Sequence, residues 1–300
     1  MKAPASRAAG GAERIDYRIR WQGSDVHPGA HRSRVAGGGD VFRGVVPLGP
    51  GRDARRIDLR ASLADPWGRP WVREFRQHSR VPVLLLADLS RSMRFAGRCD
   101  RLALCADFAR ALAPAAFRNG DPFGFVGCDR EPRRELLVAP AVSRQAGETV
   151  ARRLEAVRAE DPHRAAAGSA DGLARAARWL PQRRSLVFLL SDLYLDDALL
   201  ERTLRSLAPH QVVLVLLADS AEREPPARWG LVRLADLESG RERLVLLRPG
   251  LARQMAEQQA ARIAAATRLA RRHGASLLVA EDGLDTKAIT RQLLQPRGRA

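Results

Sequence analysis

The sequence predicts an α/β fold over residues 81 to 300, in which a mostly parallel sheet carries helices on both faces. Short apolar runs of strand length alternate with longer segments whose apolar residues recur at helical spacing. The run Val81–Ala87 is continuously apolar, as expected for a strand covered on both faces. With 300 residues, 45% of them hydrophobic, the chain is long enough for one large domain and an extension.

Apart from a hairpin described below, six strands and six helices are expected after residue 80. The helices are indicated by spacings such as Leu102, Cys105 and Ala109, and Pro181 and Gly274 suit helix ends. Strands are expected at Val81–Ala87, Phe123–Val126, Leu136–Val138, Leu186–Leu190, Gln211–Ala218 and Ser276–Ala280. Helices are expected at Arg101–Leu112, Gly147–Val157, Gly172–Leu180, Asp197–Leu207, Leu251–His273 and Thr286–Leu294. The first, fourth and fifth strands should be parallel neighbours in one sheet.

Residues 1 to 80 form a Gly- and Arg-rich extension, in which only short β-structure is expected. We expect it to pack on the large domain through the charges of Arg55, Arg56 and Asp58. Its extended pieces are predicted at Arg18–Trp21, Val41–Val46 and Trp71–Phe75.

A β-hairpin is expected to interrupt the α/β pattern at about residues 228–248. Two apolar-rich runs within Leu231–Leu247 flank the polar turn Glu238–Arg241, which contains a Ser-Gly pair.

Arginine dominates the charge of the chain, whose formal net charge is +17 and whose pI is about 11.4. The arginines are scattered along the sequence and aromatic residues make up only 5%, whereas nucleic-acid modules concentrate charge and interleave aromatics. Solvated arginines are therefore favoured over a phosphate-binding surface, although a basic nucleic-acid or acidic-surface binding protein remains the alternative. A weak affinity for polyanions is expected in either case.

No segment is expected to span a membrane, because the longest apolar runs are strand-sized and a membrane helix needs ~20 residues. The first residues lack the apolar core of a signal peptide, so a cytoplasmic location is expected. Three cysteines without a CxxC pair predict free thiols rather than a zinc site or disulfides.

The segment that carries chemistry is Asp88-Leu89-Ser90-Arg91-Ser92, directly after the first buried strand. In an extended turn, alternate side chains point the same way, so Asp88, Ser90 and Ser92 present one carboxylate and two hydroxyls together. A second strand ends at Asp192, which should reach the same crevice, and Ser169 offers a further hydroxyl.

These hard oxygen donors suit Mg²⁺ or Mn²⁺. The alternative for Asp88 is an ordinary turn or helix-capping aspartate. For Ser169 the alternative is open in the same way, because Gly168 or Asp171 could cap the following helix. The pattern DxSxS on a buried strand, followed by a second strand with a terminal aspartate, favours the metal site.

The DxSxS segment resembles the metal-ion-dependent adhesion site of von Willebrand factor A-type domains, which have a Rossmann-like fold. Those domains add a Thr or Ser from a second loop, matched by Ser169, and an Asp from a third, matched by Asp192. Upstream, Gly51–Ser62 and then Val72–Phe75 resemble the segments that precede this strand in the DUF58 family. The resemblance covers roughly residues 30 to 220, with Arg52 and Leu59 departing from the family's pattern.

The resemblance implies a non-enzymatic interaction module, whose cation captures an acidic residue of a protein partner. Members of DUF58 are commonly paired with MoxR-type AAA+ ATPases, which implies an adaptor in a chaperone-like system. A metal-dependent hydrolase is a less favoured alternative. Aspartyl-phosphate phosphatases carry a second Asp as general acid where this chain has Ser90, and no P-loop or GxSxG elbow occurs.

Overall fold

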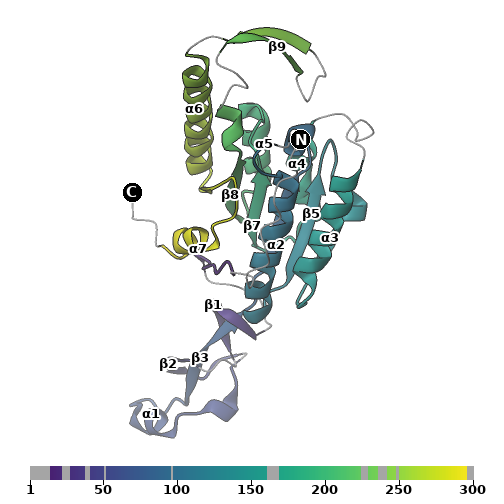
Figure 1. Cartoon of the computed structure of the whole chain (residues 1–300). Coiled ribbons are helices and arrows are strands. Elements are labelled where there is room, and N and C mark those ends of the chain that lie inside the picture. Colours follow the sequence, from purple (N-terminus) through teal and green to yellow (C-terminus); the bar gives the residue numbers. More distant parts are fainter. Residues whose placement is uncertain are drawn as a thin grey trace. The chain divides into compact units, whose positions relative to one another are not determined.

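The computed structural model describes residues 14–21, 28–37, 41–50, 52–95, 97–160, 169–223, 229–235, 242–247 and 250–295. The chain divides into two compact units (Figure 1). The larger contains residues 1–18, 82–118 and 122–300, and the smaller contains residues 19–81 and 119–121.

A six-stranded sheet forms the centre of the large unit, and only the edge strand β6 is antiparallel to its neighbour. The strand order is β11-β8-β7-β4-β5-β6. The strands are β4 (Val83–Asp88), β5 (Phe123–Cys128), β6 (Val138–Ala141), β7 (Leu186–Ser191), β8 (Gln211–Ala218) and β11 (Ser276–Glu281). The predicted mostly parallel sheet is confirmed, and so is the prediction that β4, β7 and β8 are parallel neighbours.

The chain reverses its direction of winding between β4 and β7. From β4 it proceeds outward through β5 and β6, and then returns to β7 on the other side of β4. The carboxyl ends of β4 and β7 therefore flank the topological switch point, which is where open α/β sheets bind ligands. Asp88 closes β4, and Asp192 directly follows β7.

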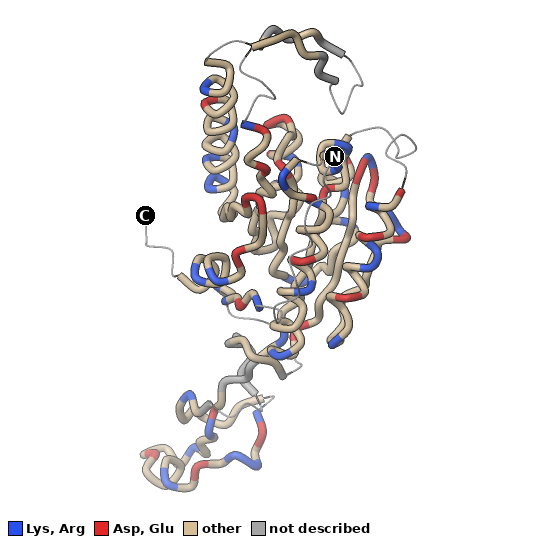
Figure 2. Tube along the Cα trace, in the orientation of Figure 1, with Lys and Arg blue, Asp and Glu red and all other residues tan. Residues whose placement is uncertain are grey.

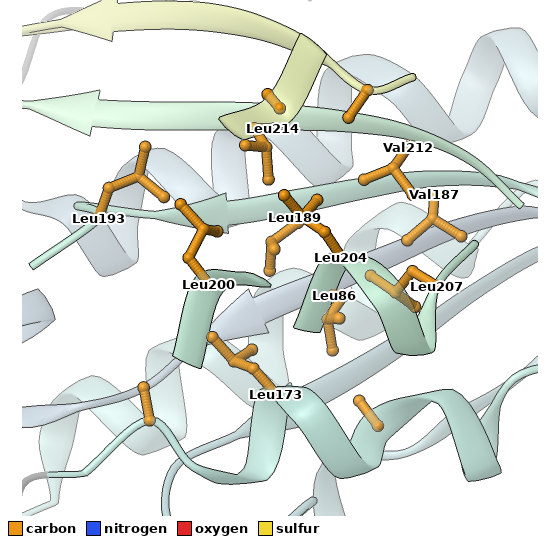
Figure 3. Close-up of a cluster of buried hydrophobic side chains, with 14 of the residues drawn as sticks. Leu86, Leu173, Val187, Leu189, Leu193, Leu200, Leu204, Leu207, Val212 and Leu214 are labelled. Atoms are coloured by element: carbon orange, nitrogen blue, oxygen red, sulfur yellow. The ribbon is translucent and has the colours of Figure 1, made fainter. Parts of the chain in front are cut away.

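Helices cover both faces of this sheet. On one face, Leu173, Leu200 and Leu204 from helices point toward Leu86 and Leu189 on the strands (Figure 3). Residue 188 points the opposite way from residue 189, and Phe188 contacts Phe108 of α2 with ring centroids 5.5 Å apart. The helices are α2 (Arg101–Arg118), α3 (Ala146–Ala159), α4 (Gly172–Arg175), α5 (Asp197–Ser206), α6 (Leu251–Arg272) and α7 (Thr286–Leu294).

Two predicted elements are shorter or displaced. The helix expected at Gly172–Leu180 is α4 followed by the 3₁₀ turn η4 (Ala176–Trp179), and it ends where Pro181 forces Leu180 into an extended conformation. The strand expected at Leu136–Val138 begins only at Val138, because Leu136 closes the 3₁₀ turn η3 (Arg134–Leu136), where its side chain is buried.

The smaller unit is built on the antiparallel sheet β1-β3-β2. The strands β2 and β3 confirm two of the predicted extended pieces, but Arg18–Trp21 is irregular, so that prediction is wrong. Just upstream, the Ile15 amide donates to the Ala111 carbonyl of α2, so this part of the chain is held by a helix rather than by a strand. The elements are β1 (Pro28–Gly37), β2 (Val41–Pro47), η1 (Ala54–Arg56), α1 (Leu59–Ala64) and β3 (Trp71–Ser79).

The charges expected to hold the extension on the large domain make contacts inside the small unit. Asp58 pairs with Arg73 at 2.8 Å, and Arg56 lies over the ring of Phe75. Packing of the extension through these charges stays a prediction.

The expected hairpin is present as β9 (Gly230–Ala235) and β10 (Glu242–Leu247), which are antiparallel in continuous register. The turn predicted at Glu238–Arg241 lies outside the described residues. Helix α6 follows and ends as predicted, with Gly274 at a φ of 69°. Over the described residues, no helix is both long enough and apolar enough to cross a bilayer.

Candidate metal site at the switch point

Asp88 is fully buried at the end of β4, and both of its carboxylate oxygens accept hydrogen bonds. The Ser90 amide donates to Oδ1 at 2.8 Å, and the Ser191 hydroxyl donates to Oδ2 at 2.7 Å. The first bond belongs to the turn that leaves β4, and the second comes from the last residue of β7. The carboxylate is therefore held in one orientation between two neighbouring strand ends.

The hydroxyls of Ser90 and Ser92 lie beside each other, with an Oγ–Oγ distance of 3.1 Å. Both side chains are buried. Ser90 precedes the 3₁₀ turn η2 (Arg91–Arg94), and its side chain makes no capping bond to that turn. The two hydroxyls are therefore directed at each other rather than used as a helix cap, which agrees with the predicted grouping of oxygen donors.

Asp192 is buried at the same edge of the sheet. Its Oδ1 accepts the Tyr194 amide at 3.0 Å, while its Oδ2 accepts no hydrogen bond from the residues that the structure describes. The Nη1 of Arg101 lies 3.4 Å from this oxygen, so the two buried side chains form an ion pair. A buried carboxylate oxygen without a hydrogen bond is costly unless another ligand satisfies it.

Around this pair, one buried cation serves two carboxylates, because Arg101 pairs with both Asp192 and Glu222. Burial, reinforced by the negative charge of Asp192, raises the pKa of Asp88 to about 7, and the bonds from Ser191 and Ser90 only partly offset this. Asp88, Ser90, Ser92 and Asp192 are the residues that would hold a divalent cation, and its charge would offset the repulsion between the two carboxylates. Two carboxylates and two hydroxyls are hard donors, so the residues present fit Mg²⁺ or Mn²⁺.

Metal-free protein is expected to lose stability as the pH rises from about 4 to about 7. The folded-state pKa of Asp88, about 7, lies above its ordinary value of 3.8, so the folded state holds this proton more tightly than the unfolded chain. The favourable contribution is complete below the unfolded pKa and is lost as the pH rises through the folded one. Urea denaturation in EDTA across this range measures the effect. Asp88→Asn has no proton to release and should flatten the profile, so identical slopes for both proteins would contradict it.

Arg101, at the start of α2, is a buried part of the site that sequence reasoning missed. Its Nη1 donates to the Ser92 carbonyl at 3.0 Å and its Nε to the Leu217 carbonyl at 3.1 Å, and the guanidinium also pairs with Glu222. It therefore ties the serine turn, Asp192 and the end of β8 together. Nothing in the sequence marks it, because it is one of many arginines on predicted helices.

Ser169 makes its hydrogen bonds locally. Its hydroxyl donates to the Asp171 carboxylate, and the Asp171 amide donates back to it at 3.2 Å. The described contacts thus join Ser169 to Asp171 rather than to Asp88, and its neighbour Gly168 lies outside the described residues. A ligand role for Ser169 stays a prediction.

A second group of potential ligands consists of Cys99, Asp219 and Asp282, whose ligand atoms all lie within 4.8 Å of one another. The Asp219 carboxylate already accepts the amides of Arg98, Cys99 and Ala221 at 2.8–3.1 Å. Burial, then the charge of Asp219, raises the pKa of Cys99 to about 12, so the thiol stays protonated. This group joins the loop before α2 to the end of β8 and has a structural role.

The fold and the cluster together define a doubly wound α/β protein with an acidic, hydroxyl-rich site at its switch point. The chain belongs to the DUF58 family of proteins of unknown function, whose model matches residues 47–266. The match extends further toward the C-terminus than the resemblance recognised in the sequence. The chain is also similar to an "Uncharacterized protein in moxR 3'region" of Paracoccus denitrificans. The two are 42% identical over 97 residues, which are 32% of this chain and 92% of the relative.

Two solved structures resemble this chain at low sequence identity. The conserved hypothetical protein BatB from Bacteroides thetaiotaomicron is 13% identical with a TM-score of 0.40, covering 71% of this chain and 97% of that one. An aerotolerance-related membrane protein from Bacteroides fragilis is 17% identical with a TM-score of 0.40, covering 71% and 98%. At these scores, the fold assignment rests on the strand order of this chain itself.

Proposed function

We propose that this chain is a non-enzymatic, metal-dependent protein-interaction module that binds Mg²⁺ through Asp88, Ser90 and Ser92. Asp192 completes the site directly or through water, and Ser169 is a further candidate donor. The observation that carries the proposal is the pair of buried carboxylates at adjacent strand ends, one with its pKa raised and the other with an unbonded oxygen. The buried cation nearby, Arg101, pairs with both Asp192 and Glu222, so it compensates the negative charge of this group only in part.

A bound divalent cation would supply an electrophilic centre that accepts a carboxylate from a partner protein. The two serine hydroxyls are neutral donors, so they leave more positive charge on the cation than carboxylates would. Enzymatic use of the site is disfavoured, because Ser90 occupies the position at which an aspartyl-phosphate phosphatase has its general acid.

The partner we propose is a MoxR-type AAA+ ATPase, for which this chain would act as an adaptor. The support is family membership together with the relative named for its position in a moxR 3' region. Relatives of one family often keep the same kind of partner, and an acidic residue on the ATPase would engage the cation.

Capture of a purified MoxR-type ATPase on immobilised full-length protein tests the proposal. Binding is expected with Mg²⁺ and is expected to fall by at least about tenfold with EDTA or in Asp88→Ala, because a carboxylate bond to the cation is a charge-assisted contact. Asp107→Ala is the matched control, since Asp107 is exposed on α2 and its ion pair within the described residues is with the partly exposed Arg110. This control should bind like the wild type.

The result also separates the proposal from binding by net charge. A charge-driven complex would weaken steeply with salt and ignore the chelator. Binding that is equal in Mg²⁺ and EDTA, or unchanged in Asp88→Ala, would contradict the metal-dependent mechanism.

A further inference from the structure

The short helix α1 in the small unit exposes its apolar residues to solvent. Leu59 and Leu63 lie four residues apart on one helical face, and Trp67 follows in the next turn. These three side chains are 72%, 87% and 75% exposed. A helix of a folded protein normally turns such a face toward the core, yet no residue of α1 is buried.

Polar contacts explain how α1 forms without a buried face. The Asp58 carboxylate caps its first turn by accepting the Ala61 amide at 3.0 Å. The Ser62 hydroxyl donates to the Asp58 carbonyl at 2.8 Å and accepts the Trp71 amide at 2.7 Å, which fastens the helix to the start of β3. These hydrogen bonds hold the polar side of the helix against the rest of the unit. Its two leucines therefore face the solvent.

The segment around these residues carries a net positive charge, although the Asp53 side chain is also exposed. Residues 52–73 contain six arginines and three aspartates. The Asp65 side chain is 3% exposed, because it accepts the amides of Trp67 and Arg69, whereas the Arg69 side chain is 53% exposed. The same contrast holds for Asp58 and Arg73. Figure 2 shows the alternation of charged positions along this unit.

Arg69 also lies over the ring of Trp67, with its guanidinium carbon 4.8 Å from the ring centroid. Tryptophan and arginine side chains of this kind are favoured where a bilayer meets water, because the ring sits at the headgroups and the cation reaches the phosphates.

From this geometry we propose that α1 and the turn after it, with Leu59, Leu63 and Trp67 as the inserting side chains, dock the protein on an anionic lipid surface. Three side chains on one helix and turn are too few for a protein interface, which takes about 20–30 residues a side. They are sufficient for shallow insertion into a bilayer, where apolar area and attraction to anionic lipids add. A nucleic acid would use the arginines but leave the leucines in water.

The position within the unit suits this role. Helix α1 precedes Trp71, where β3 begins, and lies at one end of the small sheet (Figure 1). Unit 2 passes into unit 1 just after Ser79, where β3 ends. The inserting residues are thus at the end of β3 away from that chain connection. The proposal does not depend on the metal site.

Sedimentation of the full chain with vesicles tests the proposal. Vesicles of equal parts phosphatidylglycerol and phosphatidylcholine should bind the protein, and vesicles of phosphatidylcholine alone should bind it much less. The variant Leu59→Gln/Leu63→Gln should lose at least about tenfold in affinity for the mixed vesicles, because two apolar side chains no longer insert. The control Leu231→Gln/Leu244→Gln removes two leucines of the hairpin that are exposed to a similar degree, and it should bind normally.

Two further measurements make the outcome decisive. Brominated lipids should quench the tryptophan fluorescence of the wild type, and this quenching should be lost in Trp67→Phe. Melting curves should show that both double variants stay folded. Equal vesicle binding by the α1 variant and the wild type would mean that charge alone drives binding, and would overturn the proposal. The proposal would also be overturned if the wild type did not bind vesicles. It would be overturned as well if light scattering showed that Leu59→Gln/Leu63→Gln changes the oligomeric state.

Discussion

Addition of Mg²⁺ is expected to raise the melting temperature of the wild-type protein by about 5 °C or more at a concentration of ~100 Kd. A ligand that binds only the folded state stabilises it by RT ln(1 + [L]/Kd), which is about 2.7 kcal/mol at that concentration. The gain is expected here because burial and the negative charge of Asp192 raise the pKa of Asp88, and a cation held by these residues would offset both effects. Mn²⁺ should act in the same direction.

The site variants should fall in a definite order in this assay. Asp88→Ala is expected to abolish the shift, because it removes a charged ligand that two hydrogen bonds hold in place. Ser92→Ala should only weaken it, since water can replace one neutral donor. Asp192→Ala should lie between them if that carboxylate acts through water. Without metal, Asp88→Ala should lower the melting temperature less than removal of a buried polar side chain usually does, because the substitution also removes the repulsion between Asp88 and Asp192.

Equal melting curves in Mg²⁺, Mn²⁺ and EDTA would show that the DxSxS segment forms a turn and binds no metal. The proposed capture of a partner carboxylate would then have no basis. Docking of α1 on lipid would be unaffected, because its residues lie in the other unit.

Replacement of Arg101 by methionine is expected to destabilise the protein by about 3–5 kcal/mol, the usual cost of removing one partner from a buried ion pair. The guanidinium is buried, and it pairs with Asp192 and Glu222 while donating to two backbone carbonyls. Methionine leaves both carboxylates without their cation and both carbonyls without this donor. Urea denaturation at constant pH, with the same slope for both proteins, measures the loss.

Arg110→Met supplies the control for this measurement. Arg110 lies on the same helix and pairs with Glu148 and Glu155, but the group is open to solvent, so the expected cost is at most about 1 kcal/mol. Adding Asp192→Asn to Arg101→Met should recover part of the loss, because it removes the uncompensated charge. If Arg101→Met and Arg110→Met lower the free energy of unfolding by the same amount, the buried ion-pair network stabilises the protein no more than a surface ion pair does.

Local pattern was sufficient to predict the centre of the fold. The strands β4, β7 and β8 are apolar except at one terminal residue each, as is typical of strands in a sheet covered on both faces by helices. The same logic places Asp88 and Asp192 together, because the carboxyl ends of parallel neighbours lie at one edge. The hairpin followed from two apolar runs around a polar turn.

Elements without such a pattern were missed or displaced. Strand β1 contains Gly, Ser, His and Arg, and its register is irregular, so neither apolar alternation nor a turn signal identifies it. Arg18–Trp21 has strand-like composition, but the chain just before it finds a hydrogen-bond partner on α2 instead of a neighbouring strand. Propensity is a weak guide where tertiary contacts supply the partner.

The sequence by itself determined the parallel sheet and the presence of two carboxylates and two hydroxyls at one edge of it, because periodicity and strand polarity are local properties. Only the tertiary structure decided which side chains contact each other. Ser191 donates a hydrogen bond to Asp88, Arg101 forms an ion pair with Asp192, and Ser169 donates to Asp171. The tertiary structure also decided that α1 keeps its leucines in solvent. The physical reason is that burial and pairing depend on residues distant in the chain, and no local pattern records them.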